Sequence, residues 1–515
     1  MLPIVIAFYP AMTSVDFLLQ VEDFLAGTHH VDVPMDGKLE IVVEEGLSAH
    51  HPIAVTLLYG SLTLLGMTFS GGDANIGLFL CQLFNLFAGA ACLSFISCKM
   101  FKLFDNRSVI VALVIIVVFP FSFLQILNCG KDSLFAMSFA IMIVLLVETV
   151  WAEGKTLASK KYIIGLSVIS TFCVLTRVTA TFIVIPTLIV VGIVYREKLK
   201  SIVAVGLICI LVGIVPVNIA VSSGLLLRDD VFREACGNMF QQTAAYSLAY
   251  PDEQTEEEKE AINKVLIYDN FETFYDPDIA DGIKFGTYRL NEKISKEDEN
   301  NYLKVYIEEG SKHPEIYATA LFDLLKPYVI PAYATGYEHM FFTMDDEIRD
   351  YFVSEKGIVL SEEDFPNGGV IEDIQSPEIL SWLFEHGKAP AFRMNAKYFE
   401  VLDEYMQTNT NSPMKQFYQM LPYTIFSIPI IGTIFSRASF ALYMPLLIML
   451  FSVLRRRKVI VYIAPIILLM LSLLFCPCAP ERYIAPLIIA DQFLLIPLAF
   501  DVISSLKIFS KPKTD

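Results

Sequence analysis

The sequence predicts an α-helical polytopic membrane protein with about ten transmembrane helices and a mainly helical extracytoplasmic domain inserted before the last three spans. Of the 515 residues, 55% are hydrophobic and only 18% are charged, which is unusual for a soluble enzyme. The charge is concentrated, because residues 222–436 hold 38 acidic and 17 basic side chains. The overall net charge of −18 lacks the basic surface that nucleic-acid binding requires, so no nucleic-acid partner is expected.

Nine apolar runs approach the roughly 20 residues with which a helix crosses a bilayer. They lie at residues 76–97, 108–127, 133–152, 162–176, 180–195, 202–221, 437–454, 459–475 and 482–502. A tenth is the shorter apolar stretch of residues 2–12, which has neither the basic n-region nor the cleavage site of a signal peptide. We therefore expect an N-terminal transmembrane module at residues 1–221 and a C-terminal one at residues 437–515.

Basic residues in the short loops predict the orientation of these spans. The loops carry Lys99, Lys102, Arg107, Lys155, Lys160, Lys161, Arg196, Lys198, Lys200, Arg455, Arg456, Arg457, Lys458, Lys507, Lys511 and Lys513. All of them fall on one side if each run crosses once, and that side is the cytoplasm. The acidic domain at 222–436, which is long enough to bury its own core, is then extracytoplasmic in a multi-pass protein of the cell membrane.

The same charge rule decides how the apolar segment before the first clear span is interpreted. Residues 13–51 form the first outer loop. Residues 52–69 are apolar enough to span, but counting them would invert the first basic loop, so we expect a helix lying at the outer interface. The alternative is a true span with an imperfect charge rule.

Cations and carboxylates are delivered to one level at the outer face of the membrane. Lys131 follows the run that ends at 127, Arg177 lies at the tip of a short hairpin, and Arg482 opens the last span. Asp16 and Asp132 come to the same level. Cations placed there suit a phosphate group, for which arginine offers bidentate geometry, and a carboxylate beside a bilayer can be tuned as a base. The alternative is that each residue caps a helix end or reaches out to water.

Histidines and cysteines give only weak support for a metal. His51 and its neighbour His50 cannot point the same way on a helix, and the nine cysteines lack metal-ligand spacing. Zinc bound by these residues with His29 and His30 is the weaker alternative, and hydrogen bonding to phosphate is the better role for a histidine here. The cofactor stays unknown, and a divalent metal is not supported.

Five short motifs in this order resemble the GT-C membrane glycosyltransferases, and most closely an uncharacterised bacterial branch of that class. The motifs are YPAMTSVDFLLQ (9–20), HHPIAVTLLYG (50–60), GKDSLFA (130–136), LTRVT (175–179) and ERYIAPL (481–487). The resemblance covers about the first 220 and the last 80 residues. It departs from the class in having one clear acidic residue in the first outer loop.

The resemblance implies a transferase that takes a sugar from a polyprenyl-phosphate carrier and passes it to a glycan, lipid or protein of the cell envelope, within the membrane lipid. It implies Asp16 as general base and Asp132 as second acidic residue. Arg177 and Arg482 would contact the carrier phosphate, and Lys131 and His51 would assist. Two other classes stay open: a multi-pass transporter, although its ionisable groups usually lie at the bilayer midplane, and an envelope assembly protein without catalysis.

Overall fold

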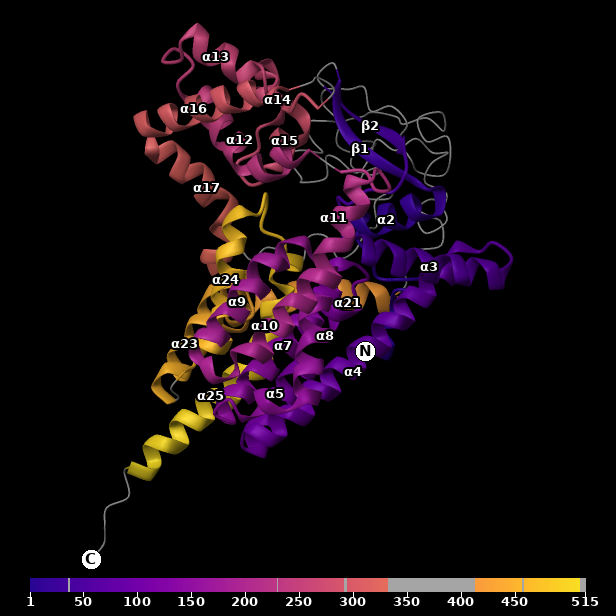
Figure 1. Cartoon of the computed structure of the whole chain (residues 1–515), viewed down its shortest axis with the longest axis vertical. Helices are drawn as coiled ribbons and strands as arrows, with labels where there is room; N and C mark the ends of the chain where they lie inside the picture. The colour runs from indigo at the N-terminus through magenta and orange to yellow at the C-terminus, as the bar shows by residue number, and fades with distance from the viewer. Residues whose placement is uncertain (36–37, 229, 291–293, 332–412, 456–457, 510–515) are drawn as a thin grey trace, which may run out of the picture.

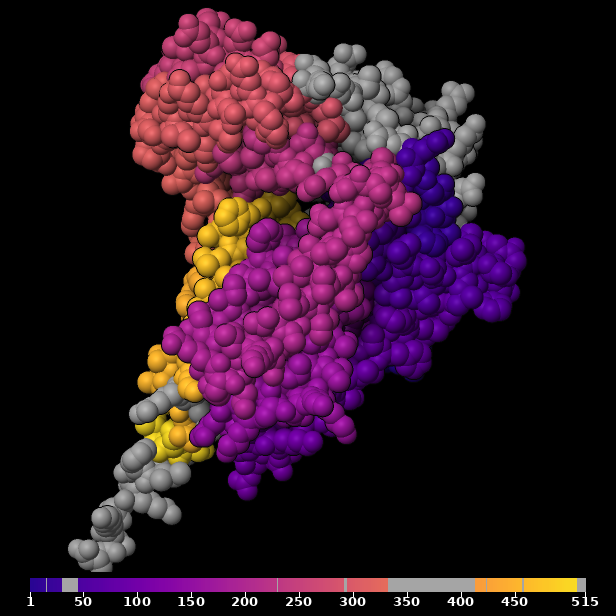
Figure 2. Space-filling model, viewed as in Figure 1, coloured from indigo at the N-terminus to yellow at the C-terminus, as the bar shows by residue number. Residues whose placement is uncertain are grey.

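A computed structural model of the chain describes residues 1–35, 38–228, 230–290, 294–331, 413–455 and 458–509. A bundle of apolar helices carries a lobe of polar helices at one end (Figure 1). In the space-filling view the lobe rests on the C-terminal segment, drawn in yellow, which emerges between the lobe and the bundle (Figure 2). The site described below lies at this junction.

The N-terminal part supplies most of the bundle. Its elements are α1 (Leu2–Ala7), α2 (Val15–Ala26), β1 (Thr28–Met35), β2 (Lys38–Glu45), α3 (Ile53–Ser70), α4 (Ala74–Leu103), α5 (Asn106–Val118), α6 (Phe121–Leu127), α7 (Lys131–Trp151), η1 (Lys155–Ala158), α8 (Lys160–Thr176), η2 (Val178–Ala180), α9 (Thr181–Val194), η3 (Arg196–Lys198), α10 (Leu199–Ile208), η4 (Cys209–Ile214) and α11 (Val215–Ser222). The stretch 13–51, expected as an outer loop, folds into α2 and an antiparallel hairpin of β1 and β2.

The lobe is helical in its described part, with α12 (Val231–Ala249), α13 (Glu256–Asn263), η5 (Tyr268–Asn270), α14 (Phe271–Phe274), α15 (Asp281–Thr287), α16 (Lys296–Lys312) and α17 (Pro314–Val329). Thr255 and Glu258 form the reciprocal capping box that starts α13, and Pro314 opens α17. Phe240, Phe271 and Tyr302 belong to a core separate from that of the bundle.

The C-terminal part returns to the bundle through α21 (Pro413–Ser427), α22 (Pro429–Ile434), η8 (Ser439–Tyr443), α23 (Met444–Arg455), α24 (Ile460–Ser472), η9 (Leu473–Phe475) and α25 (Glu481–Phe509). Four of the basic residues used for orientation, Arg456, Arg457, Lys511 and Lys513, lie outside the described residues.

The expected number of about ten spans is too high. In the described ranges, five helices are long and apolar enough to cross a membrane: Ile53–Ser70, Ala74–Leu103, Lys131–Trp151, Arg196–Ser222 and Glu481–Leu506. A sixth is added if α5 and α6, bent by 65° at Pro120, count as one broken span. Other apolar helices, such as Val178–Val194, Ser439–Arg455 and Ile460–Phe475, have at most 17 residues. At 1.5 Å per residue they measure about 26 Å or less, short of the roughly 30 Å hydrocarbon core.

Helix α7 is the centre of the bundle, since 89% of its apolar 18-residue stretch is buried inside the molecule. It packs against α4, α8, α24 and α25. Because a helix buried on all sides must be apolar all round, this explains the run from Leu134 to Val147, in which Ser138 is the one polar residue. The first turn of α7, at the end nearest the lobe, is polar and begins the site.

Helices α3 and α4 form a hairpin in which the two backbones touch. A Cβ atom on Gly66 would lie 2.4 Å from the Cα atom of Gly77, so only glycine permits this approach. Expected as an interfacial helix, α3 also meets the length and composition required of a span.

Candidate functional site

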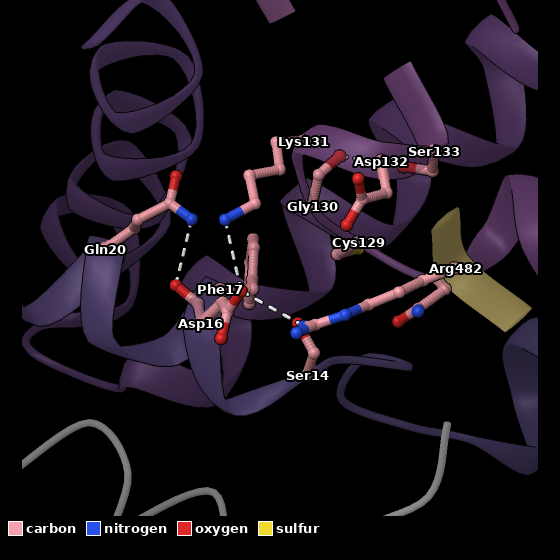
Figure 3. Close-up of a pocket in the computed structure, with 11 residues that line it drawn as sticks. Ser14, Asp16, Phe17, Gln20, Cys129, Gly130, Lys131, Asp132, Ser133 and Arg482 are labelled. Atoms are coloured by element: carbon pink, nitrogen blue, oxygen red, sulfur yellow. Dashed lines mark hydrogen bonds and ion pairs between the residues drawn. The ribbon is translucent and has the colours of Figure 1, made fainter. Parts of the chain in front are cut away.

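Two cations from distant parts of the chain hold the carboxylate of Asp16. Asp16 lies in the first turn of α2, Lys131 in the first turn of α7 and Arg482 in the first turn of α25. Lys131 Nζ lies 3.1 Å and Arg482 Nη1 3.0 Å from Asp16 Oδ2 (Figure 3). The same oxygen therefore accepts both bonds, and three helix N-termini meet at it, which adds positive potential.

His51 extends this group through Lys131. The Lys131 ammonium lies 2.9 Å from His51 Nδ1, and because an ammonium group can only donate, Nδ1 accepts. His51 directly precedes Pro52, the N-cap of α3. The histidine thereby fixes the direction in which the Lys131 side chain points.

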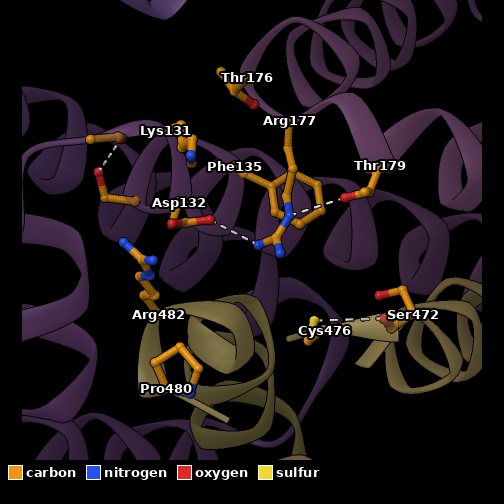
Figure 4. Close-up of polar contacts among 12 residues, drawn as sticks. Lys131, Asp132, Phe135, Thr176, Arg177, Thr179, Ser472, Cys476, Pro480 and Arg482 are labelled. Carbon is orange, nitrogen blue, oxygen red and sulfur yellow. Dashed lines mark hydrogen bonds and ion pairs between the residues drawn. The ribbon is translucent and has the colours of Figure 1, made fainter. Parts of the chain in front are cut away.

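A second ion pair lies beside the first. Arg177 Nη1 donates to Asp132 Oδ1 at 2.8 Å, and Arg177 Nε donates to Thr179 Oγ1 at 3.1 Å (Figure 4). Arg177 ends α8, and Asp132 follows Lys131 in the first turn of α7. The guanidinium group also lies 5.6 Å from the centre of the Phe135 ring, a cation–π distance that holds it in place.

The ring of Tyr483 joins the two pairs. Its centre lies 5.0 Å from the guanidinium carbon of Arg177 and 5.3 Å from that of Arg482. Both arginines therefore lie within cation–π distance of the same ring, in addition to their ion pairs with carboxylates. The structure thus brings together Asp16, Lys131, Asp132, Arg177, Arg482 and His51, the six residues singled out in the sequence, while their chemical roles stay predictions.

The cations of the site stabilise the Asp16 carboxylate in the ionised form. Burial alone would raise the pKa of Asp16, but the charges of Arg482 and Lys131 lower it well below its ordinary value. The two carboxylates face three permanent cations, so the site keeps a net positive charge. Arg482 Nε is buried and makes no hydrogen bond within the described residues, so this arginine retains donor capacity for an anion.

Polar side chains inside α4 hold the loops that carry the site. Gln82 Oε1 accepts a hydrogen bond from the backbone amide of Met12 at 2.6 Å, and Gln82 Nε2 donates to the carbonyl of Leu127. Gln82 therefore holds both loops in place. Asn85 donates to the carbonyls of Ile126 and Asn128 and accepts the hydroxyl of Tyr59 at 2.7 Å. These residues were missed in the sequence. Their signal is two amide side chains three positions apart in an apolar run, which puts them on one face of the helix.

Gly130 gives α7 its starting geometry. Its φ of +150° is one that side chains rarely adopt, and its amide donates to the Tyr59 hydroxyl at 3.4 Å. The glycine therefore turns the chain so that Lys131 and Asp132 begin the helix at the site.

The segment that leads into Arg482 is held by the lobe. Asn238 Nδ2 donates to the carbonyls of Leu474 and Cys476 at 3.0 and 3.3 Å, the amide of Ala280 donates to Pro477 at 2.7 Å, and the Tyr328 hydroxyl donates to Pro480 at 2.8 Å. The position of Arg482 therefore depends on the lobe as well as on the bundle.

An ion pair next to Arg482 anchors the start of the last helix. Arg437 pairs with Glu481, both side chains being 7% exposed, and Arg437 Nη1 donates to the carbonyl of Ala479 at 3.0 Å. The structure places Arg437 and Glu481 next to Arg482, where their ion pair holds the start of α25.

An apolar groove of about 870 Å³ runs down the bundle beside the site. It is lined by α4, α7 and α8, with Leu134 and Met137 at one end and the ion pair of Lys99 with Glu148 at the other. From Leu134 to Glu148 the helix rises about 21 Å, most of the thickness of a bilayer core. Leu134 follows Ser133, which lines the polar cleft of Asp16 and Arg482, so consecutive residues of α7 line the cleft and the groove.

The weaker zinc alternative gains no support from the geometry. In the portion of the chain that the structure describes, no group of three or more His, Cys, Asp or Glu residues is arranged to hold a metal ion. The side chain of His30 lies outside the described residues. The rings of His29 and His50 are 6.2 Å apart and those of His50 and His51 4.4 Å.

One ionisable residue in the middle of a span was overlooked. Asp491 lies ten residues into α25 and is fully buried, and neither carboxylate oxygen makes a hydrogen bond within the described residues. Hydropathy gives no sign of this residue, because one acid in a long apolar run leaves the mean hydropathy of the run high.

Comparison with known proteins gives one result. A model of a family of unknown function, DUF6020, matches residues 44–502, which include every site residue named above except Asp16. No curated protein and no solved structure matches the chain. Since the match spans most of its length, the protein, a helical chain with several candidate membrane spans, belongs to the DUF6020 family.

Proposed function

We propose that this protein is an integral-membrane glycosyltransferase that moves a sugar from a polyprenyl-phosphate carrier to a cell-envelope acceptor at the outer face of the membrane. The observation that carries the proposal is the convergence of Lys131, Arg177 and Arg482 with two carboxylates, directly beside an apolar groove. A lipid-linked phosphate needs both a cationic site for its head and an apolar path for its tail. Acidic residues are needed in addition for chemistry at the sugar.

Arg482 and Arg177 are the candidate contacts of the carrier phosphate. Arg482 uses Nη1 for Asp16, which leaves its Nε edge to donate to two phosphate oxygens in parallel. As the bond between the anomeric carbon and the phosphate oxygen breaks, negative charge grows on the phosphate. Guanidinium groups already held in place stabilise that charge without reorganisation.

The carboxylates would act on the acceptor. Asp16 Oδ2 accepts the hydrogen bonds of both cations. Oδ1 then remains to accept a hydrogen bond from the hydroxyl group of the acceptor. The resemblance gives Asp16 the role of base, and Asp132 would keep Arg177 aligned. The groove between α4, α7 and α8 would hold the prenyl chain, and Lys131 with His51 would complete the cationic wall.

The topology of the proposal follows the charge rule. The site lies at the lobe end of the bundle, and the basic loops that carry Lys99 and Lys161 lie at the other end of the groove. With basic loops in the cytoplasm, the site and the domain at 222–436 are extracytoplasmic.

The test is to incubate the purified full-length protein with a panel of polyprenyl-phosphate sugars and to measure release of the carrier phosphate. We expect release by the wild type and a loss of about 10²–10³-fold in Arg482→Ala or Arg177→Ala, the usual effect of removing one donor to a developing charge. Arg455→Ala is the matched control, because Arg455 pairs with Asp501 near the opposite end of α25. Equal rates in all three variants would refute the assignment of the phosphate site.

A transporter is the second candidate, and Asp491 is the observation that favours it. A buried carboxylate without a hydrogen bond in the middle of a span is typical of ion and proton pathways. Reconstitution in liposomes separates the two functions. Solute flux that depends on Asp491, without any release of carrier phosphate, would favour the transporter.

A further inference from the structure

The end of the groove away from the candidate site is polar and positively charged. Among the described residues that line the groove, the charged ones are Lys99, Glu148 and Lys161, and all three lie at this end. The hydroxyl groups of Thr156 and Ser159 line the same end. We call the end formed by these five residues the inner mouth. Two ammonium groups and one carboxylate leave it with a net positive charge.

The direction of the three helices brings these residues to one level. Lys99 lies in the last two turns of α4 and Glu148 in the last turn of α7, whereas Lys161 lies in the first turn of α8. Between the two ends, the lining residues of each helix recur three or four positions apart, which places them on one face. On α4 and α7 they are Phe84, Ala88, Ala91, Cys92, Phe95, Lys99, Leu134, Met137, Ser138, Ile141, Leu145 and Glu148.

The inner mouth is held in shape by contacts within the protein. Lys99 Nζ lies 2.8 and 2.6 Å from the two carboxylate oxygens of Glu148, which ties α4 to α7. The hydroxyl groups of Tyr162 and Thr149 are 2.6 Å apart and share a hydrogen bond, which ties α8 to α7. The mouth is therefore formed before any ligand enters it.

Hydrogen-bond donors remain at the inner mouth after these contacts are made. Lys161 is exposed and makes no ion pair in the described part of the chain. Ser159 Oγ accepts the amide of Tyr162 at 3.4 Å, so its own O–H group is left to donate. Lys99 gives two of its three N–H groups to Glu148. Ammonium and hydroxyl donors of this kind suit a phosphate group.

The charge around the inner mouth favours an anionic lipid. The two segments that meet there, residues 99–107 and 148–161, hold six basic and three acidic residues. By the charge rule this end faces the cytoplasm, where the leaflet carries anionic lipids and basic pockets between helices bind their head groups. An acyl chain reaches about 15 Å, half of the hydrocarbon core, and the groove of about 21 Å is long enough to hold it.

We propose that the inner mouth binds the phosphate group of an anionic phospholipid from the cytoplasmic leaflet, with one acyl chain of that lipid lying in the groove. Lys161 and Ser159 donate to the phosphate oxygens, and Lys99 adds its remaining N–H group. The acyl chain takes up much of the groove that the prenyl chain of the proposed carrier would use, so the phospholipid competes with the carrier. This competition alone rests on the proposed function.

The experiment measures binding of three probes to the purified full-length protein in detergent micelles by native mass spectrometry. The probes are dioleoyl phosphatidylglycerol, dioleoyl phosphatidylcholine, which has the same chains and no net charge, and inorganic phosphate, which has no chains. We expect phosphatidylglycerol to bind most tightly. Lys161→Gln should weaken its binding about fivefold, the usual effect of one lysine on an anionic lipid, and should leave phosphatidylcholine binding unchanged. Lys161→Arg should keep the wild-type affinity.

Lys200→Gln is the matched control, because Lys200 begins α10 among the basic loops but does not line the groove. It should bind phosphatidylglycerol as the wild type does. Gly165→Trp, which fills the groove beside the open space at Gly165, should weaken binding of both lipids.

Three results would overturn the proposal. Equal effects of Lys161→Gln and Lys200→Gln would mean that the lysines attract anionic lipids only diffusely. Equal affinity for the two phospholipids would mean that the inner mouth does not bind a charged head group. Inorganic phosphate that binds as tightly as phosphatidylglycerol would mean that no lipid chain is recognised. The assay contains no polyprenyl carrier, so its outcome does not depend on whether the protein is a glycosyltransferase.

Discussion

Removing Arg437 tests whether the start of the last helix is anchored by a buried ion pair. Arg437→Met leaves Glu481 in a site where only 7% of its side chain reaches solvent, and it removes the donor to Ala479. Breaking a buried pair from one side typically costs about 3–5 kcal/mol, because the remaining charge is desolvated without its partner. We expect a loss of that size in the free energy of unfolding.

The assay is denaturant unfolding of the purified protein in detergent micelles for Arg437→Met, Glu481→Gln and the double variant. If the pair behaves as described, the double variant should be more stable than Arg437→Met, since neither charge is then buried alone. Single variants as stable as the wild type, or a double variant whose loss is the sum of the two single losses, would refute the reasoning. Arg455→Met, which breaks the more exposed pair with Asp501, should cost less than about 1 kcal/mol.

Three further predictions concern the groove, the buried carboxylate and the lobe. Gly165 lines the groove and has open space beside it, so Gly165→Trp should reduce binding of a fluorescent prenyl phosphate, whereas Ile164→Trp on the lipid-facing side should not. Asp491→Leu should raise the free energy of unfolding by about 1–3 kcal/mol, because it removes a buried polar group without a hydrogen bond; a loss of stability would contradict this. Burial raises the pKa of Glu309 to about 7, so the unfolded chain releases this proton first, and stability should fall by up to about 3 kcal/mol between pH 4.5 and 7. Glu309→Gln should remove that part of the slope in urea unfolding.

The sequence predicted the helical membrane character because apolar runs report it directly, but it overestimated the number of spans. Runs such as residues 459–475 have the composition of a span, yet the helices that form there are too short to cross alone. The bend at Pro120 likewise divides one apolar run into two helices. Hydropathy reports the composition of a segment and does not report the length of the helix that the segment forms.

The site residues were identifiable in the sequence because their common level at the membrane follows from the charge rule. Which acid pairs with which cation was not, since Arg482 and Asp16 are 466 residues apart. Gln82 and Asn85 were visible as polar interruptions, but their partners are backbone carbonyls, which carry no sequence pattern.

The route by which Arg482 reaches Asp16 has a consequence for biogenesis. A ribosome makes the chain from its N-terminus, so Asp16 and Lys131 emerge long before Arg482. The guanidinium group of Arg482 contacts the same Asp16 oxygen as Lys131 does. Seating of the lobe also waits for the carbonyls of Leu474, Cys476, Pro477 and Pro480. A nascent chain stalled before Leu474 would therefore hold a candidate site without Arg482 and a lobe without these four carbonyl partners.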